Sequence, residues 1–213
     1  MNIHTVCMKG NRMSDQRRTQ AERSADTRES LIAAARALFA EHGFADVALE
    51  TIVRAAGVTR GALYHHFPDK TELFAAVFEQ VEAEVAAHMG EAIAAAHQTD
   101  PIEVMGLGAG FWLDACADPE IQRIVLVDAP AVLGWTRWTE IGNRYNTGLV
   151  RALLTSAIES GRIPPQPVEA TALTMLGAMR EATLYVALAQ DHDQARQEAG
   201  AVMDRLIHAL GAD

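Results

Sequence analysis

Side chains that donate hydrogen bonds are concentrated between residues 59 and 70. Hydroxyl, guanidinium, imidazole and ammonium groups bind phosphate oxygens and base edges, which are the acceptors that double-stranded DNA presents. A glycine among them allows the backbone to approach a ligand closely. The candidate DNA-binding residues are Thr59, Arg60, Gly61, Tyr64, His65 and Lys70. We expect Arg60 and Gly61 to lie nearest the base edges and the other four to contact mainly phosphates.

Residues 48–67 predict the scaffold for these donors, which is two short helices joined by a tight turn. Gly57 lies where the chain must reverse, and glycine adopts a positive φ at little cost. Thr59 is a good N-cap for the second helix. Leu63 and Phe67 fall on one inward face, because residues four apart are neighbours on a helix. This layout is typical of a helix-turn-helix whose second helix enters a DNA major groove.

An enzyme is the competing hypothesis, and few features of the sequence favour it. The chain has no nucleophile elbow, phosphate-binding glycine loop or metal-ligand spacing. His65 and His66 are adjacent, so they point about 100° apart on a helix and cannot form an i, i+4 metal pair. We therefore expect no catalytic residue, no cofactor and no metal site. A transcriptional activator, or a regulator whose body binds only another protein, stays open as a third hypothesis.

The stretch AAGVTRGALYHHFPDKTELF at residues 55–74 resembles the DNA-binding segment of the tetracycline-repressor (TetR) family of bacterial regulators. The likeness extends upstream through AAARALFAEHGF at residues 33–44. It implies an all-α homodimer with a three-helix DNA-binding head and a helical ligand-binding body. The implied function is that of a repressor, released from operator DNA by a small apolar or amphipathic molecule of unknown identity. The expected divisions are a flexible arm, a helix-turn-helix domain and a ligand-binding and dimerisation domain, at residues 1–24, 25–72 and 73–213.

The first helix of the motif departs from the family pattern. Many members have Thr or Ser just before it, whereas this chain reads Val47-Ala48-Leu49. Glu50 follows, where relatives can use a basic residue to contact DNA. A carboxylate there would repel phosphates, could accept a hydrogen bond from cytosine, or could be a solvated helix residue, and we favour the last interpretation. We expect the first helix to contribute less DNA contact than usual.

Charge is distributed unevenly along the chain. The net charge of the 213 residues is -10, yet residues 1–80 hold ten basic and ten acidic residues. All of the acidic excess therefore lies in residues 81–213. An acidic body would repel phosphates and orient the neutral head toward DNA. Improved solubility is an equally weighted alternative.

Composition also bounds the cellular setting. The two cysteines, Cys7 and Cys116, are far apart and show no zinc or disulfide spacing. No run of about 18 apolar residues predicts a membrane span, and residues 1–10 do not read as a secretory signal. We expect a reduced, cytoplasmic location. Met13 is a second plausible start, and the arginines before residue 24 could form a minor-groove arm or a solvated tail.

Turn and cap signals divide the rest of the chain into helices. Asp26 with Glu29, and Asp69 with Glu72, are each spaced as a capping box. The first box predicts a helix that ends at His42-Gly43, and the second a long helix to about residue 96. Breaks are expected at 99–101, at 128–130 and at the proline-rich linker 163–167. The remaining helices are expected at 102–117, from 118, at 135–160, at about 168–190 and at about 194–210.

Aromatic and methionine side chains mark a candidate ligand cavity on the central helices, because such side chains suit an adaptable apolar cavity. The candidates are Leu107, Phe111, Trp112, Trp135, Trp138, Tyr145, Met175 and Met179. The alternative for each is ordinary core packing. Polar candidates for ligand specificity are Asp114, Asp128, Arg144 and Arg180, with surface or paired charges as the alternative.

Two apolar stripes near the C-terminus predict a dimer surface, in which two helices from each chain form a four-helix bundle. The candidate interface residues are Leu173, Leu176, Gly177, Leu184, Leu188, Val202, Leu206 and Leu210. These stripes could instead close the core of a monomer, and the resemblance favours the dimer.

Overall fold

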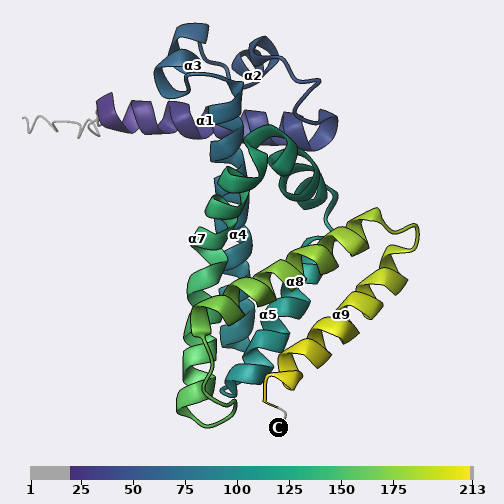
Figure 1. Cartoon of the computed structure of the whole chain (residues 1–213). Coiled ribbons are helices and arrows are strands. Elements are labelled where there is room, and N and C mark those ends of the chain that lie inside the picture. Colours follow the sequence, from purple (N-terminus) through teal and green to yellow (C-terminus); the bar gives the residue numbers. More distant parts are fainter. Residues whose placement is uncertain (1–19, 212–213) are drawn as a thin grey trace, which may run out of the picture.

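The computed structural model describes residues 20–211, and every regular element in that range is helical. The all-α prediction is confirmed. A small head carries α1 (Gln20–His42), α2 (Leu49–Ala55) and α3 (Arg60–His66). The body contains α4 (Lys70–Ala95), α5 (Pro101–Ala115), α6 (Pro119–Ile121), the π-helical η1 (Gln122–Asp128), α7 (Ala129–Glu159), α8 (Val168–Leu188) and α9 (His192–Ala209). Figure 1 shows α2 and α3 above α1, with the long α4 and α7 descending from the head toward α5, α8 and α9.

The turns of the head form where the sequence predicts them. Gly43 ends α1 with a φ of 79°, and Gly57 reverses the chain between α2 and α3 with a φ of 66°. The Thr59 hydroxyl accepts a hydrogen bond from Ala62 N at 3.2 Å, which caps α3. These local signals work because each depends on one residue and its immediate neighbours.

A continuous apolar core holds the head on α4. Leu31, Phe39, Ile52, Leu63 and Phe74 are fully buried within it. Burial of one such side chain contributes about 1.5–3 kcal/mol. The three-helix head is therefore anchored to the first turns of α4 by packing as well as by the chain connection.

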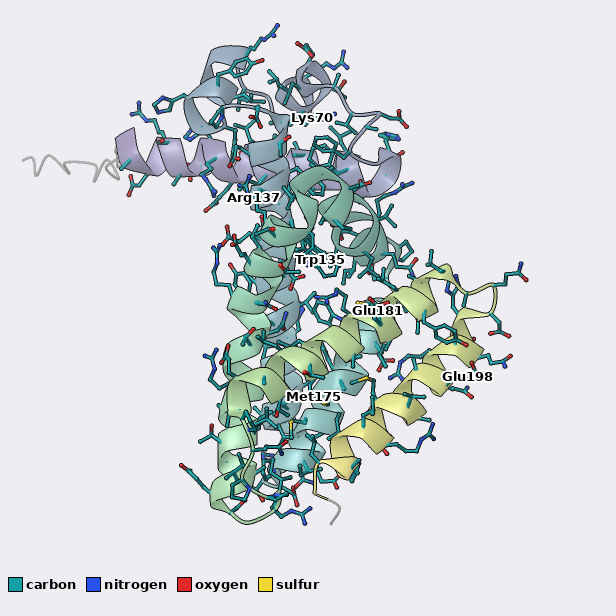
Figure 2. All side chains as sticks on the ribbon, viewed as in Figure 1. Lys70, Trp135, Arg137, Met175, Glu181 and Glu198 are labelled. Atoms are coloured by element: carbon teal, nitrogen blue, oxygen red, sulfur yellow. The ribbon has the colours of Figure 1, made fainter. Side chains whose placement is uncertain are left out.

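Both capping boxes differ from their predicted form. Asp69 does cap α4, accepting from Glu72 N at 2.9 Å. The Glu72 carboxylate does not return to the cap, because the Arg137 guanidinium of α7 donates two hydrogen bonds to it at 2.6 and 2.8 Å. Asp26 does not start a helix, since α1 already includes Gln20. Figure 2 shows Arg137 on α7 just below the head.

The predicted break at 128–130 is also wrong. The chain stays helical from η1 into α7, with Pro130 in the first turn of α7. The kink lies instead at Gly134, whose φ is 72° and ψ is 161°. Among the described residues, no helix is long and apolar enough to cross a membrane.

Candidate DNA interface and effector cavity

The outer face of α3 presents most of the predicted DNA-binding residues. Thr59, Arg60, Gly61, Tyr64 and His65 are all exposed. Leu63 is fully buried beneath them, so it anchors the helix inward and directs this face to solvent. A Cβ on Gly61 would meet only the Thr59 hydroxyl, at an ordinary 3.9 Å. Nothing within the described protein therefore requires glycine at residue 61.

Arg60 is held in place by its neighbours on α2 and α3. Its guanidinium forms an ion pair with Glu50 at 3.2 Å and a long hydrogen bond with the Tyr64 hydroxyl at 3.4 Å. Both charged side chains are exposed, so the pair is weak and open to exchange with a phosphate or a base. Glu50 is thus a solvated helix residue, as the sequence favoured, and also an ion-pair partner of Arg60. Ala48 gives α2 no side-chain cap, in line with the departure seen in the sequence.

Lys70 differs from its prediction as a phosphate contact. Its ammonium donates to the carbonyls of Phe44 and Val47 at 2.6 and 2.8 Å. It also lies 4.2 Å from the centre of the Phe44 ring, and partial burial lowers its pKa. Lys70 therefore ties the loop after α1 to the start of α4. Figure 2 labels this residue within the head. The sequence alone did not distinguish these roles for Lys70, because a lysine can hydrogen-bond either to the carbonyls of a nearby loop or to a DNA phosphate.

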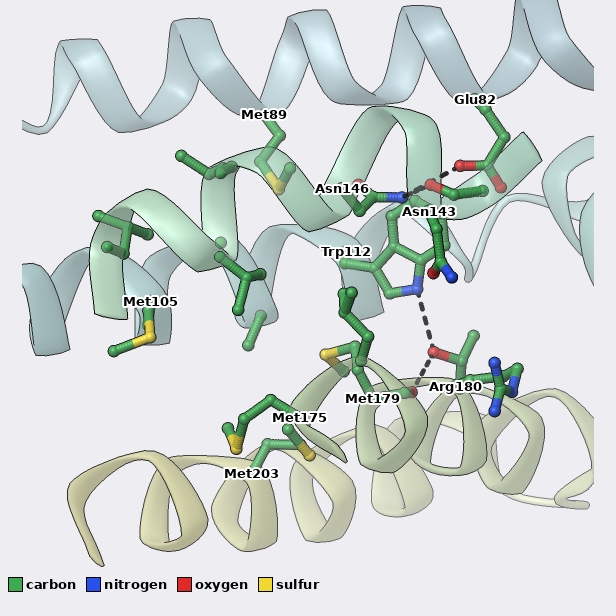
Figure 3. A pocket seen from close by; sticks show the side chains of 18 of the residues that line it. Glu82, Met89, Met105, Trp112, Asn143, Asn146, Met175, Met179, Arg180 and Met203 are labelled. Atoms are coloured by element: carbon green, nitrogen blue, oxygen red, sulfur yellow. Dashed lines mark hydrogen bonds between the residues drawn. The ribbon is translucent and has the colours of Figure 1, made fainter. Parts of the chain in front are cut away.

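A cavity of about 150 Å³ lies in the body, between helices α4, α5, α7, α8 and α9 and η1. Four predicted residues line it, namely Trp112, Trp138, Met175 and Met179. Three further methionines, Met89, Met105 and Met203, extend the apolar wall. Figure 3 shows Trp112 and the five methionines converging from different helices.

The other four apolar candidates do not line the cavity. Leu107 and Trp135 are 43% and 57% exposed, because their positions on α5 and α7 turn outward. Phe111 packs against the main core, and the Tyr145 hydroxyl donates to Glu79 at 3.2 Å. Helical spacing identified three of the elements that line the cavity, α5, α7 and α8, but it did not fix which side of each helix faces the cavity.

Glu82 is the main polar residue that the sequence analysis missed. Its side chain lines the cavity, is 3% exposed and accepts one hydrogen bond, from Asn146 at 3.3 Å. Burial raises the pKa of this carboxyl to about 7, against the opposing effect of the Asn146 hydrogen bond. The sequence feature that could have identified Glu82 is its position next to Val81, in the apolar stripe of a long helix, where an acidic residue is unusual.

Three of the four predicted polar specificity residues lie outside the cavity. Asp114 pairs with Arg196, and Arg144 pairs with Glu79. Asp128 accepts a hydrogen bond from Phe44 N in the head at 2.8 Å.

The fourth, Arg180, lines the cavity and has no ion-pair partner in the described part of the chain. Its guanidinium lies over the rings of Trp135 and Trp138, 4.4 and 5.6 Å from their centres.

Known proteins match both parts of this arrangement. The model for the N-terminal domain of bacterial tetR-family regulatory proteins matches residues 31–77, and a tetracyclin repressor-like C-terminal domain model matches residues 102–210. The chain belongs to the TetR family. Regulators of this family bind operator DNA and small-molecule effectors and act as dimers.

Individual TetR-family proteins align over different lengths of the chain. The transcriptional regulator CymR of Pseudomonas putida is 36% identical over 136 residues, which is 62% of this chain and 67% of CymR. A probable acrEF/envCD operon repressor of Escherichia coli K12 is 52% identical over 58 residues, 27% of this chain and 26% of that protein. A TetR-family regulator of Pectobacterium atrosepticum superposes with a TM-score of 0.79 at 33% identity, covering 92% and 99% of the two chains.

The predicted TetR-type dimer residues separate into two groups. Leu173, Leu188, Val202 and Leu206 are exposed, and Leu188 reaches 81% exposure. Tyr185, which the sequence analysis did not name, is exposed on the same helix as Leu188.

The remaining dimer candidates face their own chain or are partly covered by it. Leu176 lines the cavity, while Leu184 and Leu210 pack against apolar cores. Gly177 is partly buried, and a Cβ there would lie 3.8 Å from the Arg180 guanidinium.

The π-helical η1 connects the cavity to the TetR-type head. Val125 and Leu126 line the cavity, and Asp128 two residues later binds Phe44 N. Arg36 of α1 adds a second connection, because it forms ion pairs with Glu84 of α4 and Glu120 of α6. The walls of the cavity are therefore bonded directly to the head.

Proposed function

We propose that this TetR-family regulator is a homodimeric repressor that a small amphipathic effector releases from operator DNA. The observation that carries the proposal is the cavity in the body, whose walls α4 and η1 also contact the head. Relatives named as repressors support the direction of control. The proposed cellular location is the cytoplasm, where operator DNA is accessible.

The proposed DNA-binding domain is residues 25–72, and its contact surface is the exposed face of α3. Arg60 and Gly61 would lie nearest the base edges, with Thr59, Tyr64 and His65 on phosphates. In this arrangement Lys70 acts indirectly, by holding the loop after α1 against α4. Because the head carries no net positive charge, we expect modest affinity per head and strong dependence on salt.

The proposed dimer forms through α8 and α9, within the ligand-binding and dimerisation domain at residues 73–213. Leu173, Leu188, Val202 and Leu206 supply exposed apolar surface for a four-helix bundle with a second copy. Two recognition helices must lie about 34 Å apart to enter successive major grooves. Dimerisation therefore makes the spacing of the heads a requirement for tight binding.

Release follows from a shift between two conformations of the dimer. An effector contacts Val125 and Leu126 of η1 and the cavity face of α4. The conformation that accommodates it best changes the position of Asp128, and with it the head bound through Phe44 N. A small change in the spacing between the heads then weakens the grip on DNA.

The test is a footprint and a fluorescence-anisotropy titration with DNA from upstream of the protein's own gene. We expect protection of two half-sites about one helical turn apart, with affinity that falls steeply between 50 and 200 mM salt. Equal binding to that DNA and to a scrambled sequence of the same length would refute the proposal.

A further inference from the structure

Arg180 has no acidic partner, although the body has an excess of acidic residues. Several other arginines of the described body are paired: Arg137 with Glu72, Arg144 with Glu79 and Arg196 with Asp114. The net charge of -10 means that carboxylates are abundant. A shortage of acidic residues therefore does not explain why this cation is unpaired.

The Arg180 guanidinium also lacks hydrogen bonds. In the described chain, three buried side-chain atoms have no hydrogen-bond partner: Thr147 Oγ1, Gln166 Nε2 and Arg180 Nε. Of the three residues, only Arg180 lines the cavity. An unsatisfied buried donor destabilises the folded protein, and does so more strongly when the group is charged. An acceptor brought by a ligand would remove this cost.

The polar and apolar linings occupy opposite ends of the cavity. Figure 3 shows Arg180 and Asn143 at one end, with Met105 and Met203 at the other. The Asn143 amide makes no hydrogen bond within the described chain, so its donor is free as well. The indole N–H of Trp112 is already committed, because it donates to the Thr183 hydroxyl at 3.1 Å.

We propose that the cavity binds a small amphipathic carboxylate, with the anion on Arg180 and Asn143 and the apolar part among the tryptophans and methionines. This deepens the proposed function by naming the chemical class of the effector. The guanidinium forms a planar fork that matches a carboxylate, and charge-assisted hydrogen bonds are about twice as strong as neutral ones. A single guanidinium neutralises one negative charge, so a monoanion fits better than a doubly charged phosphate.

Glu82 does not oppose this assignment. Its carboxyl is held by Asn146 on α7, and burial favours its neutral form below about pH 7. A cationic ligand directed at Glu82 would share the same small cavity with the unpaired Arg180 charge. The monoanion instead compensates the cation that lacks a partner.

Intrinsic tryptophan fluorescence reports this site specifically. Trp112 and Trp138 line the cavity, and the third tryptophan, Trp135, lies under the Arg180 guanidinium. The chain has three tryptophans in all, so every one is close to the proposed anion. The probes are benzoate, phenylacetate, hexanoate and octanoate, each compared with its neutral primary amide, in the absence of DNA.

We expect at least one acid to bind the full-length dimer at least about tenfold more tightly than its amide. Arg180→Gln should lose about tenfold or more of that affinity and bind acid and amide alike, whereas Arg180→Lys should recover part of the preference. Arg151→Gln is the matched control, because it removes the same charge from an exposed ion pair with Glu169. Its acid affinity should match that of the wild type.

The proposal is overturned if no acid binds the wild type, if the amides bind as tightly as the acids, or if folded Arg180→Gln keeps the acid preference. Circular dichroism and thermal unfolding establish that each variant is folded, and Arg180→Lys supplies the test if Arg180→Gln is not. DNA binding is measured separately on the same samples. Acid binding without operator binding would reject the proposed function and retain the carboxylate site.

Discussion

At the scale of single residues, we expect a substitution of Gly61 to change the stability of the protein and its affinity for DNA in opposite directions. Its Cβ position is open within the protein, so Gly61→Ala should stabilise α3 by up to about 1 kcal/mol. The added methyl group would stand between α3 and DNA, and we expect operator affinity to fall about tenfold or more. Urea unfolding and anisotropy titration measure the two effects.

Gly90→Ala is the control for this substitution. Gly90 is exposed on α4, and a Cβ there meets no atom within 4 Å, so stability should rise without a change in DNA affinity. Unchanged operator binding by Gly61→Ala would show that the backbone of α3 does not approach DNA closely.

Glu50 is expected to restrain the recognition helix. Glu50→Gln removes the ion pair with Arg60 and a negative charge near the phosphates, so operator affinity should rise about three- to tenfold at low salt. The gain should shrink as salt is raised. Glu159→Gln makes the same change of net charge at the far end of α7 and should have little effect. A fall in affinity for Glu50→Gln would indicate that the carboxylate accepts from a base.

Glu82 makes stability depend on pH. Its folded-state pKa of about 7 lies above the ordinary value of 4.5, so between these values the folded protein binds more protons than the unfolded chain. The contribution of Glu82 to the free energy of unfolding is therefore complete below pH 4.5, and it is lost as the pH rises through about 7. Glu82→Gln does not titrate and should be more stable than the wild type at pH 8 by on the order of 1–3 kcal/mol.

Urea unfolding at pH 5 and pH 8 tests this prediction. The difference between Glu82→Gln and the wild type should largely disappear at pH 5. Glu91→Gln on the exposed side of α4 is the control and should follow the wild type at both values. A difference for Glu82→Gln that is the same at both pH values would contradict the assigned pKa.

Residues whose role depends on near neighbours were predictable from sequence. Thr59 caps α3, Gly57 reverses the chain and Asp69 caps α4, because each acts within four positions along the chain. Lys70 and Glu72 were not, because their partners Phe44 and Arg137 come from other elements. The cavity shows the same division, since α5, α7 and α8 were predicted to line it, whereas the contributions of α4, η1 and α9 and the inward side of each helix depended on tertiary packing.

At the scale of elements, η1 is the segment that contacts both the cavity and the DNA-binding head. Asp128→Ala removes the acceptor for Phe44 N and should destabilise the protein by about 1–3 kcal/mol. Effector affinity should stay within about threefold, since Asp128 does not line the cavity, while effector-driven release from DNA should weaken about tenfold. Tryptophan titration measures the first quantity and anisotropy measures the second.

Asp114→Ala provides the comparison for η1. It also breaks one carboxylate interaction, with Arg196, but that pair joins α5 to α9 within the body. Release by effector should be normal in this variant. Normal release in Asp128→Ala as well would place the coupling elsewhere, in the Arg36 ion pairs or in the apolar core that holds the head on α4.

At the scale of the whole molecule, the neutral head is proposed to contact DNA, whereas the acidic body is proposed to bind the effector and the second copy of the chain. The head offers donors but no net positive charge, and the acidic excess lies in the body. Tight binding therefore requires two heads at the correct spacing, which makes affinity sensitive to small movements transmitted through α4 and η1. A 100-fold loss of operator affinity requires the effector to favour the released conformation by about 2.7 kcal/mol.

The most direct test follows operator occupancy while the cavity is filled. Small acids, amides and amines are screened by tryptophan fluorescence, and the tightest ligand is titrated into the protein–operator complex under anisotropy detection. Operator affinity should fall in step with cavity occupancy, by about tenfold or more at saturation. Full occupancy of the cavity with unchanged operator affinity would contradict release of operator DNA by a ligand in this cavity.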